Sequence, residues 1–477
     1  MPASSSKPLI EELDTQLSAA AAFAIVKDEP FSYFLDSGMD PAKLGRFSFV
    51  GYSPFLVLKT RGNDVEVRDE RDAHRFSGDP FETLRAILSA NKLERDAECP
   101  VPFTGGGVGY LSYDLGRHIE DIPSVAKDDL QLPECCFGFY DAGLVFDHQT
   151  GKAYAVSTGL PEREERARQQ RARFRLEKLK SNILSSRSTK SSSAERGSRE
   201  CAKAAEANFT RDGYMKAVQR ARQYIIDGDI FEVNLSQRFE APIAVCPYEL
   251  YCRLRAINPA PFASYLGFDD VQVVGASPER FLCKRGKDVE TRPIKGTRRR
   301  GKTPEEDARL AAELTLSAKD HAENMMIVDL ERNDLGRVSE YGSVRVTELA
   351  ILESYPTVFH LTSTVRGRLA EGKDCIDLLR AAFPGGSITG APKVRSMEII
   401  EELEPTRRSL YTGSVGYLGF NGDMDLNIVI RTFLVKGDRV YFQAGGAVVY
   451  DSDPAEEYQE TLDKARALFA ALNLATT

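Results

Sequence analysis

The stretch GASPERFLCKRGKDVETRPIKGTRRRG, residues 275–301, contains two strand-like runs around a turn and predicts a β-hairpin. We expect its strands at Glu279–Lys284 and Val289–Ile294. If the loop is effectively three residues long, Glu279 lies directly opposite Lys295, with their Cβ atoms roughly 5 Å apart. A loop of two or four residues would instead place the two side chains on opposite faces.

The same stretch could carry chemistry. Pro293 cannot donate to a ladder, so its strand is expected to be an edge or to end there. Gly296 would let the backbone approach a ligand closely. Lys295 could act as a nucleophile if burial, or the adjacent arginines 298–300, keep its amine partly neutral. A neighbouring carboxyl group, Glu279, could then serve as general acid. The alternative is a surface hairpin with a solvated basic turn.

The rest of the chain predicts an α+β fold with large antiparallel or mixed β-sheets flanked by helices. Residues 1–160 are expected to form a β-rich N-terminal domain, residues 161–207 a charged helix with little apolar face and a Ser-rich linker, and residues 208–477 a second domain. In the last helix, which starts at Pro454, apolar residues recur at 4-3-4-3 spacing, and this stripe is expected to be core.

Composition excludes several classes of protein. The 477 residues carry a net charge of −8, so the overall charge favours neither nucleic acid nor an anionic membrane as partner. No apolar run is long enough for a signal peptide or a membrane span, and the eight cysteines form no CxxC pair. With only five histidines, a metal is expected on carboxylates, which favours Mg²⁺ over zinc. The expectation is a cytoplasmic enzyme or binding protein.

A glycine-rich segment, FPGGSITGAPKVRSMEIIEEL at 383–403, leads directly into a helix. Backbone N–H groups, hydroxyls and a helix N-terminus together would form a cradle for an anion. The spacing is not that of a nucleotide P-loop. The alternative is an ordinary turn followed by a helix.

Charged residues in two other regions suggest ligand contacts. Glu457 and Glu460 lie one turn apart on the last helix, and Glu323 lies on the helix expected at 318–331, so carboxylates could hold a hard cation, or could simply be solvated. Arg431 is expected inside an otherwise apolar strand, where an unpaired charge is costly. Its partner could be a ligand carboxylate or an internal ion pair.

Together these motifs resemble the chorismate-utilising enzymes, the family of the anthranilate synthase and aminodeoxychorismate synthase large components. The resemblance is strong over residues 208–474, through SPERF, PIKGTRRRG, DLERNDLGRV, FPGGSITGAPK, TGSVGYL, IVIRTF, AGGAVV and EEYQET. It is weaker over residues 34–147, through LDSG, GRFSFVGYSP and GGGVGYLSYDLGR. It implies the α/β sandwich fold of that family.

The resemblance also implies roles for individual residues. Glu279 would be the general acid, Lys295 the nucleophile, and His360 the active-site histidine. The Mg²⁺ ligands would be Glu323 and Glu460, with Glu457 close by. Chorismate would be held by Gly296, Thr297, Tyr411, Arg431, Gly445, Gly446 and Ala447.

Lys295 points to one branch of the family. It matches the lysine with which aminodeoxychorismate synthases attack C2 of chorismate and expel the C4 hydroxyl, before ammonia attacks C4 and releases the lysine. NLSQ at 234–237 resembles the same branch. This branch catalyses a transaminase-type transfer for p-aminobenzoate and folate biosynthesis. The alternatives are anthranilate synthase component I, which has alanine at this position, then isochorismate synthase, which carries a water-activating lysine where Glu232 stands here, and then a non-catalytic chorismate- or tryptophan-binding protein.

The resemblance implies partners as well. Ammonia would come from a separate glutamine amidotransferase small subunit or from free ammonium. Related enzymes also have a tryptophan pocket, and the matching positions here are Ser37, Leu44, Gly45, Arg46, Phe47, Pro261, Phe262 and Ala263.

Overall fold

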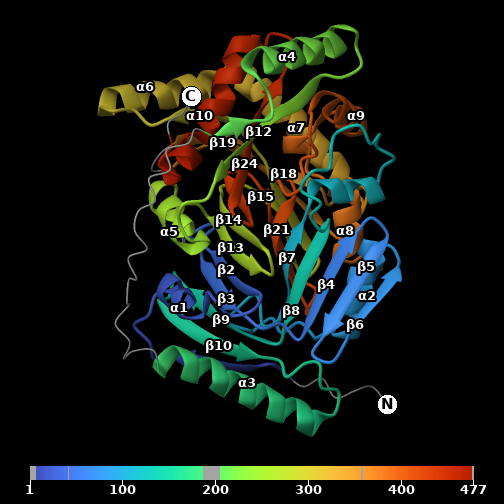
Figure 1. Cartoon of the computed structure of the whole chain (residues 1–477), viewed down its shortest axis with the longest axis vertical. Helices are drawn as coiled ribbons and strands as arrows, with labels where there is room; N and C mark the ends of the chain where they lie inside the picture. Colours follow the sequence, from blue (N-terminus) through green and yellow to red (C-terminus); the bar gives the residue numbers. More distant parts are fainter. Residues whose placement is uncertain (1–6, 41, 186–204, 356–357, 475–477) are drawn as a thin grey trace.

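The computed structural model describes residues 7–40, 42–185, 205–355 and 358–474, and these form two 12-stranded β-sheets with helices outside them (Figure 1). Every pairing between named strands is antiparallel in this part of the chain. The α+β sandwich expected from the sequence is confirmed.

The first sheet has eleven strands in one continuous order, and a twelfth strand, β20 (Gly390–Ala391), pairs with β12. The order is β1 (Leu9–Leu13), β10 (Lys152–Ser157), β9 (Ala142–Asp147), β3 (Phe47–Gly51), β2 (Ser32–Asp36), β13 (Phe262–Phe268), β14 (Val271–Ser277), β23 (Thr432–Lys436), β24 (Arg439–Val448), β12 (Glu232–Pro242) and β11 (Glu206–Ala207).

The second sheet is built in the same way, with β18 (Arg345–Ser354) joined to β19 outside the main order. That order is β17 (Ile294–Arg299), β19 (Val358–Arg368), β16 (Asp288–Arg292), β15 (Arg280–Arg285), β22 (Met424–Asn427), β21 (Ser414–Gly419), β7 (Gly106–Leu111), β8 (Cys135–Tyr140), β4 (Leu56–Arg61), β5 (Asp64–Asp69) and β6 (Ala73–Ser77).

Both sheets combine strands from the two ends of the sequence. In the first sheet β2 pairs with β13, and in the second β7 pairs with β21. Structurally, the residues before the expected joint at 161–207 and those after it therefore share both sheets. The division into 1–160 and 208–477 stays a prediction about sequence regions, and much of the Ser-rich linker falls at 186–204, outside the described residues.

The sheets pack face to face, because one apolar cluster contains side chains from both of them, such as Tyr33 and Phe49 of the first sheet and Tyr110 and Tyr417 of the second. Helices cover the outer faces. They are α1 (Ala19–Val26), α2 (Pro80–Ala90), α3 (Glu165–Ser185), α4 (Arg211–Ile226), α5 (Pro247–Ile257), α6 (Pro304–Leu316), α7 (Ala318–Gly336), α8 (Cys375–Ala382), α9 (Lys393–Leu403) and α10 (Pro454–Ala471), with short 3-10 turns at Tyr113–His118 and Gly386–Ile388. No helix within the described ranges is long and apolar enough to cross a bilayer.

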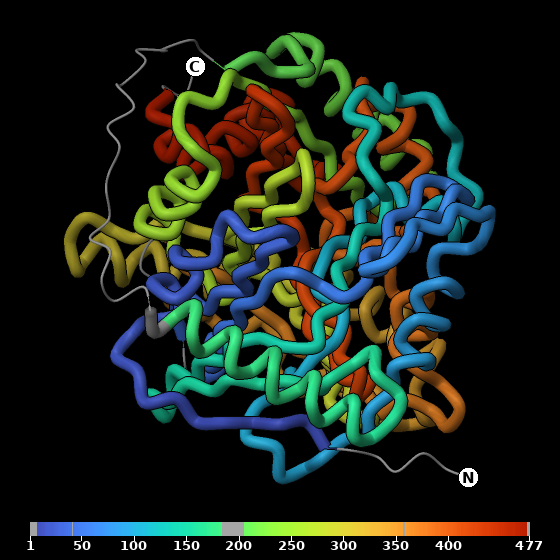
Figure 2. Tube along the Cα trace, turned by 60° about the horizontal axis from the view of Figure 1, so that its bottom comes forward, coloured from blue at the N-terminus to red at the C-terminus, as the bar shows by residue number. Residues whose placement is uncertain are grey.

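The charged helix α3 has more of an apolar face than expected. Ala172, Leu176, Leu179 and Ile183 are buried, and the helix lies along β9 and β10 (Figure 2). These residues fall at helical spacing, but the many charges between them hide the stripe in the sequence. The apolar stripe of α10 is confirmed, with Leu462, Ala465 and Phe469 in the core.

The expected hairpin exists, but its register differs. Arg285 pairs with Asp288, so the loop has two residues, Gly286 and Lys287, rather than three. A bulge between Arg280 and Cys283 then shifts the pairing by one residue, and Pro293 separates β16 from β17. Glu279 precedes β15 and is not a cross-strand partner of Lys295.

Candidate active site

Five elements supply most of the residues expected to act on a ligand. Strand β17 carries Lys295, the adjacent β19 carries His360, and β24 carries the small residues at 445–447. Helices α7 and α10, which lie against β19 and β24 respectively, supply the acidic side chains. These elements meet in the upper half of the molecule as drawn in Figure 1.

Lys295 is buried, with 7% of its side chain exposed, and its Nζ lies 2.6 Å from Oε1 of the fully buried Glu232. Burial alone would lower the pKa of Lys295, but the negative charges of Glu232, Glu323 and Glu279 outweigh burial and raise it. The expectation of a partly neutral amine in the resting site is therefore wrong, because Glu232 pairs with the lysine and further carboxylates, Glu323, Glu279 and Glu460, lie near it.

For Glu279, burial outweighs the neighbouring charges and favours the neutral form. Its carboxyl group is buried, and burial raises its pKa to about 7, although a hydrogen bond of 2.6 Å from Ser387 and the charge of Lys295 act against burial. Near neutral pH a substantial share of this side chain is protonated. A general acid requires a proton at the working pH, so the shift has the direction that this role needs.

His360 is held neutral beside the lysine strand. Burial lowers its pKa to about 4, and the nearby positive charge of Arg431 acts in the same direction. Its Nδ1 shares a hydrogen bond of 2.9 Å with the hydroxyl of Thr297. Gly296 has φ +83°, and a Cβ there would lie 3.0 Å from Asp320 Oδ1, so both the backbone conformation and the space favour glycine.

Arg431 does not lie inside a strand, as the sequence suggested, but in a bend just before β23, with φ +52°. Burial of its surroundings lowers its pKa, while Tyr411 and Glu460 act against that shift. Its guanidinium makes no ion pair with any other described residue. The alternative of an internal ion pair is therefore not found in that part of the chain, which leaves the guanidinium available for a ligand carboxylate.

The acidic side chains of α10 converge on Gly446. A Cβ on that glycine would lie 3.0 Å from Glu457 Oε2 and 3.2 Å from Glu460 Oε1. Burial, and then the charge of Glu460, raise the pKa of Glu457 to about 7. Lys464 pairs with Glu460 at 2.6 Å and lowers the pKa of that carboxyl. Burial raises the pKa of Glu323 on α7.

These carboxylates fit a metal only in part. Glu457 Oε2 is buried and has no hydrogen-bond partner among the described residues. A bound cation or a proton would satisfy this oxygen. However, no three His, Cys, Asp or Glu side chains in the described ranges gather tightly enough to hold a metal by themselves. Mg²⁺ commonly takes one or two protein carboxylates and completes its coordination with substrate and water, so the donor set suits it when an anionic ligand is bound.

The backbone of the glycine-rich segment binds a carboxyl side chain of the protein itself, that of Glu331. The amide of Gly386 donates to Glu331 Oε1 at 3.0 Å, and Lys393 pairs with Asp334. Its hydroxyl residue Ser387 is the group that binds Glu279. The segment therefore contacts buried carboxyl groups of the protein, including Glu279, and its binding of a separate anion stays a prediction.

Three contributors were not among the expected site residues. Glu232 pairs with Lys295, Ser387 binds Glu279, and Lys464 contacts both Glu460 and, at 2.9 Å, the carbonyl of Gly445. Lys464 could have been found, because it lies four residues after Glu460 on a helix. The resemblance did point to the position of Glu232, where isochorismate synthases carry a lysine, but its pairing with Lys295, 63 residues away, has no local signal in the sequence.

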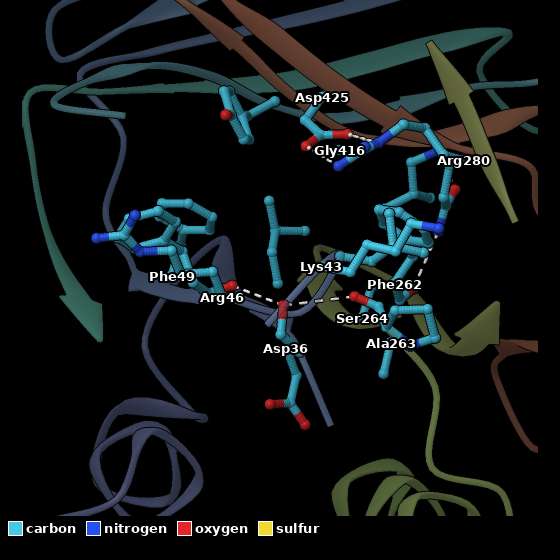
Figure 3. Close-up of a pocket in the computed structure, with 18 of the residues that line it drawn as sticks. Asp36, Lys43, Arg46, Phe49, Phe262, Ala263, Ser264, Arg280, Gly416 and Asp425 are labelled. Atoms are coloured by element: carbon cyan, nitrogen blue, oxygen red, sulfur yellow. Dashed lines mark hydrogen bonds and ion pairs between the residues drawn. The ribbon is translucent and has the colours of Figure 1, made fainter. Parts of the chain in front are cut away.

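The second candidate site is a separate cavity of about 220 Å³ between the sheets (Figure 3). Figure 3 shows Asp36, Ser264 and Phe262 on one side of it and the ion-paired Arg280 and Asp425 on another. Among the residues matched to a tryptophan pocket, those that line it are Ser37, Leu44, Arg46, Phe47, Pro261, Phe262 and Ala263. Gly45 does not line it, because its amide donates to the carbonyl of Asp40 within the turn.

Comparisons with known proteins show the family of the chain. The sequence model of the chorismate binding enzymes matches residues 60–470. The chain is 43% identical to aminodeoxychorismate synthase component 1 of Bacillus subtilis (strain 168), covering 91% of each protein. It is 42% identical to anthranilate synthase component 1 of Cereibacter sphaeroides, covering 96% of this chain and 92% of that protein. The crystal structure of anthranilate synthase component I from Streptococcus pneumoniae superposes with a TM-score of 0.76 at 34% identity, over 91% of this chain and 93% of that one.

Proposed function

The chain belongs to the chorismate binding enzyme family, and from that premise we propose that it is the large component of an aminodeoxychorismate synthase. The proposed reaction converts chorismate and ammonia to 4-amino-4-deoxychorismate. The relatives include both aminodeoxychorismate and anthranilate synthase components at nearly equal identity, so overall similarity does not choose between them. The observation that carries the choice is Lys295, a buried amine in the same site as a carboxyl group whose pKa is about 7.

In the proposed mechanism Lys295 attacks C2 of chorismate as its C4–O bond breaks. Glu279 protonates the departing hydroxyl, which leaves as water. Ammonia then attacks C4 while the C2–N bond to Lys295 breaks, and the new amine returns a proton to Glu279. The direct displacement of the C4 hydroxyl by ammonia is thus replaced by two successive displacements, first by Lys295 and then by ammonia. The ring stays bound to the protein between them.

Binding would rest on the two carboxylates of chorismate. Arg431 would take one of them, since its guanidinium has no ion-pair partner within the described part of the chain. Mg²⁺ would take the other, held by Glu323 and Glu460 with Glu457 beside them, and would neutralise charge on the substrate. Thr297, Tyr411 and the backbone at 445–447 would complete the pocket wall. Fixing both ends of the ring lowers the entropic part of the barrier.

Ammonia is proposed to come from a glutamine amidotransferase small subunit. Two of the relatives above are named as a component 1, which supports a two-subunit enzyme. Tryptophan is proposed as ligand of the cavity in Figure 3, because seven of the eight matched positions line it. Calorimetric titration with L-tryptophan tests that assignment, and an absence of binding heat at millimolar ligand would contradict it.

The decisive experiment is product analysis by mass spectrometry with chorismate, Mg²⁺ and ammonium. Aminodeoxychorismate supports the proposal, whereas anthranilate or isochorismate as the main product contradicts it. In the absence of ammonia, rapid quenching should trap a covalent chorismate-derived adduct on the wild-type protein.

Lys295→Ala should remove this adduct. Lys284→Ala is the matched control, because Lys284 is also a largely buried lysine but donates to the carbonyl of Gly422 outside the site. An adduct that persists in Lys295→Ala would rule out Lys295 as the nucleophile.

A further inference from the structure

The ion pair of Lys295 and Glu232 is buried, and its carboxylate comes from a paired strand. Glu232 is the first residue of β12, its carbonyl accepts a hydrogen bond of 3.0 Å from Ser396, and its backbone pairs with Ala391. None of its side chain is exposed. The strand thus fixes the backbone of Glu232, and the ion pair with Lys295 is the one contact of its carboxylate with another described residue.

The charge on Lys295 is an obstacle to the proposed reaction. An ammonium group has no lone pair, so it cannot attack carbon until a proton leaves. The charges that face this side chain are Glu232 from β12, Glu323 from α7, Glu279 just before β15 and Glu460 from α10, and together they favour the protonated amine. Some group in the site must accept that proton before the C–N bond forms.

Glu232 is the carboxylate placed to accept it. Within the described residues it alone forms an ion pair with Lys295, and neither Glu279 nor Glu323 lies within 4.0 Å of that amine. Glu279 is also needed in its protonated form. The second oxygen of Glu232, Oε2, is buried without a hydrogen-bond partner among the described residues. That oxygen is therefore open to accept a proton.

We propose that Glu232 is the general base that activates Lys295. The inference rests on the proposed function, because it needs Lys295 as nucleophile. In the first step the Lys295 ammonium passes one proton to Glu232, giving a neutral amine and a neutral carboxyl. The amine then bonds to C2, and Glu279 protonates the leaving hydroxyl. When ammonia has displaced the amine, Glu232 returns its proton to Lys295, and the ion pair is restored.

Glu232→Gln tests the base, since the amide keeps the shape and one acceptor oxygen but cannot take a proton. The measurement is the single-turnover rate of adduct formation with chorismate and Mg²⁺, by rapid quench and mass spectrometry, from about pH 6 to 9. At pH 7 the rate should fall about 100-fold, at the low end of general-base effects. The ratio of wild-type to variant rate should shrink about tenfold per pH unit as pH rises. Loss of protons from Glu279 affects both proteins and cancels in that ratio.

Glu232→Asp is the conservative partner of this variant, because it keeps a carboxylate. It should recover a substantial part of the rate and give a ratio to wild type that does not change with pH. Melting temperatures of both variants report whether the fold is retained.

The outcomes separate this inference from the function it rests on. If wild-type protein forms the adduct and Glu232→Gln forms it as fast, or more slowly by a factor that is the same at every pH, Glu232 is only a structural partner and the inference is wrong. If wild-type protein forms no adduct, the proposed nucleophile fails, and the base fails with it.

Discussion

Ser387 donates a hydrogen bond of 2.6 Å to Oε1 of Glu279. This contact joins the glycine-rich segment to the proposed acid and fixes the direction of its carboxyl group. It also favours the ionised form, and so holds the pKa of Glu279 lower than burial alone would set it. One hydroxyl thus controls both the position and the protonation of the acid.

Ser387→Ala should raise the pKa of Glu279 above about 7, because burial then acts with less opposition. Since the acid works in its protonated form, the descending limb of the profile of kcat against pH should move to higher pH. Ser414→Ala, which removes another buried hydroxyl bonded to the carbonyl of Asn427, is the control and should leave the limb in place. If the descending limb lies at the same pH in Ser387→Ala as in the wild type, a group other than Glu279 determines that limb.

Glu279→Gln should lower kcat by about 10²–10⁴, the range of general acid catalysis. In the wild type this acid is protonated below pH 7 and loses its proton above it, so its contribution falls as pH rises through about 7. The variant should lose this pH dependence as well as the rate. Equal kcat values for variant and wild type at pH 6 would contradict the assignment.

Arg431→Met should separate binding from stability. The guanidinium lies in buried surroundings without an ion-pair partner among described residues, so its loss should leave the melting temperature unchanged or raise it. The KM for chorismate should rise about 10- to 100-fold, as expected for one lost charge-assisted hydrogen-bond contact. A large drop in melting temperature with unchanged KM would mean that Arg431 is structural.

Glu404→Gln should destabilise the fold. Glu404 and Arg408 form a buried ion pair at 2.8 Å, and breaking such a pair typically costs about 3–5 kcal/mol in the free energy of unfolding. Denaturant unfolding should show this loss. The exposed pair of Glu249 and Arg253 is the control, and Glu249→Gln should change stability by less than about 1 kcal/mol.

Removing the metal should abolish turnover of chorismate, and added Mg²⁺ should restore it. Glu460→Gln should raise the Mg²⁺ concentration needed for half-maximal activity, whereas the exposed Glu456→Gln on the same helix should not. Full activity in the presence of excess chelator would exclude a required metal.

Much of the fold could be predicted from local patterns. The start of α10 follows from its apolar spacing and its cap Asp453, and the start of α7 follows from its cap Ser317. The hairpin was visible in its turn residues, but its register was not. A bulge at 280–283 depends on pairing with β22 as well as with β16, and no local pattern encodes that.

The sequence predicted the main residues of the site, but not the charges around Lys295 that determine its protonation. Lys295 and Glu279 were expected as nucleophile and general acid, and burial raises the pKa of Glu279 in the direction that an acid needs. The pKa of Lys295 is raised as well, against the direction that a nucleophile needs, because Glu232 and Glu323 approach it from β12 and α7. Such long-range neighbours exist only once both sheets have formed.

Because N-terminal strands pair with C-terminal strands, neither sheet can be completed until most of the chain has been synthesised. Strands β2 and β7 emerge from the ribosome long before their partners β13 and β21, which lie more than 200 residues further along. Until those partners arrive, the nascent N-terminal half has open strand edges, a known route to aggregation. A fragment that starts at residue 208 would likewise leave β13 and β21 without their partners β2 and β7. Truncation is therefore expected to yield insoluble protein rather than an isolated catalytic half.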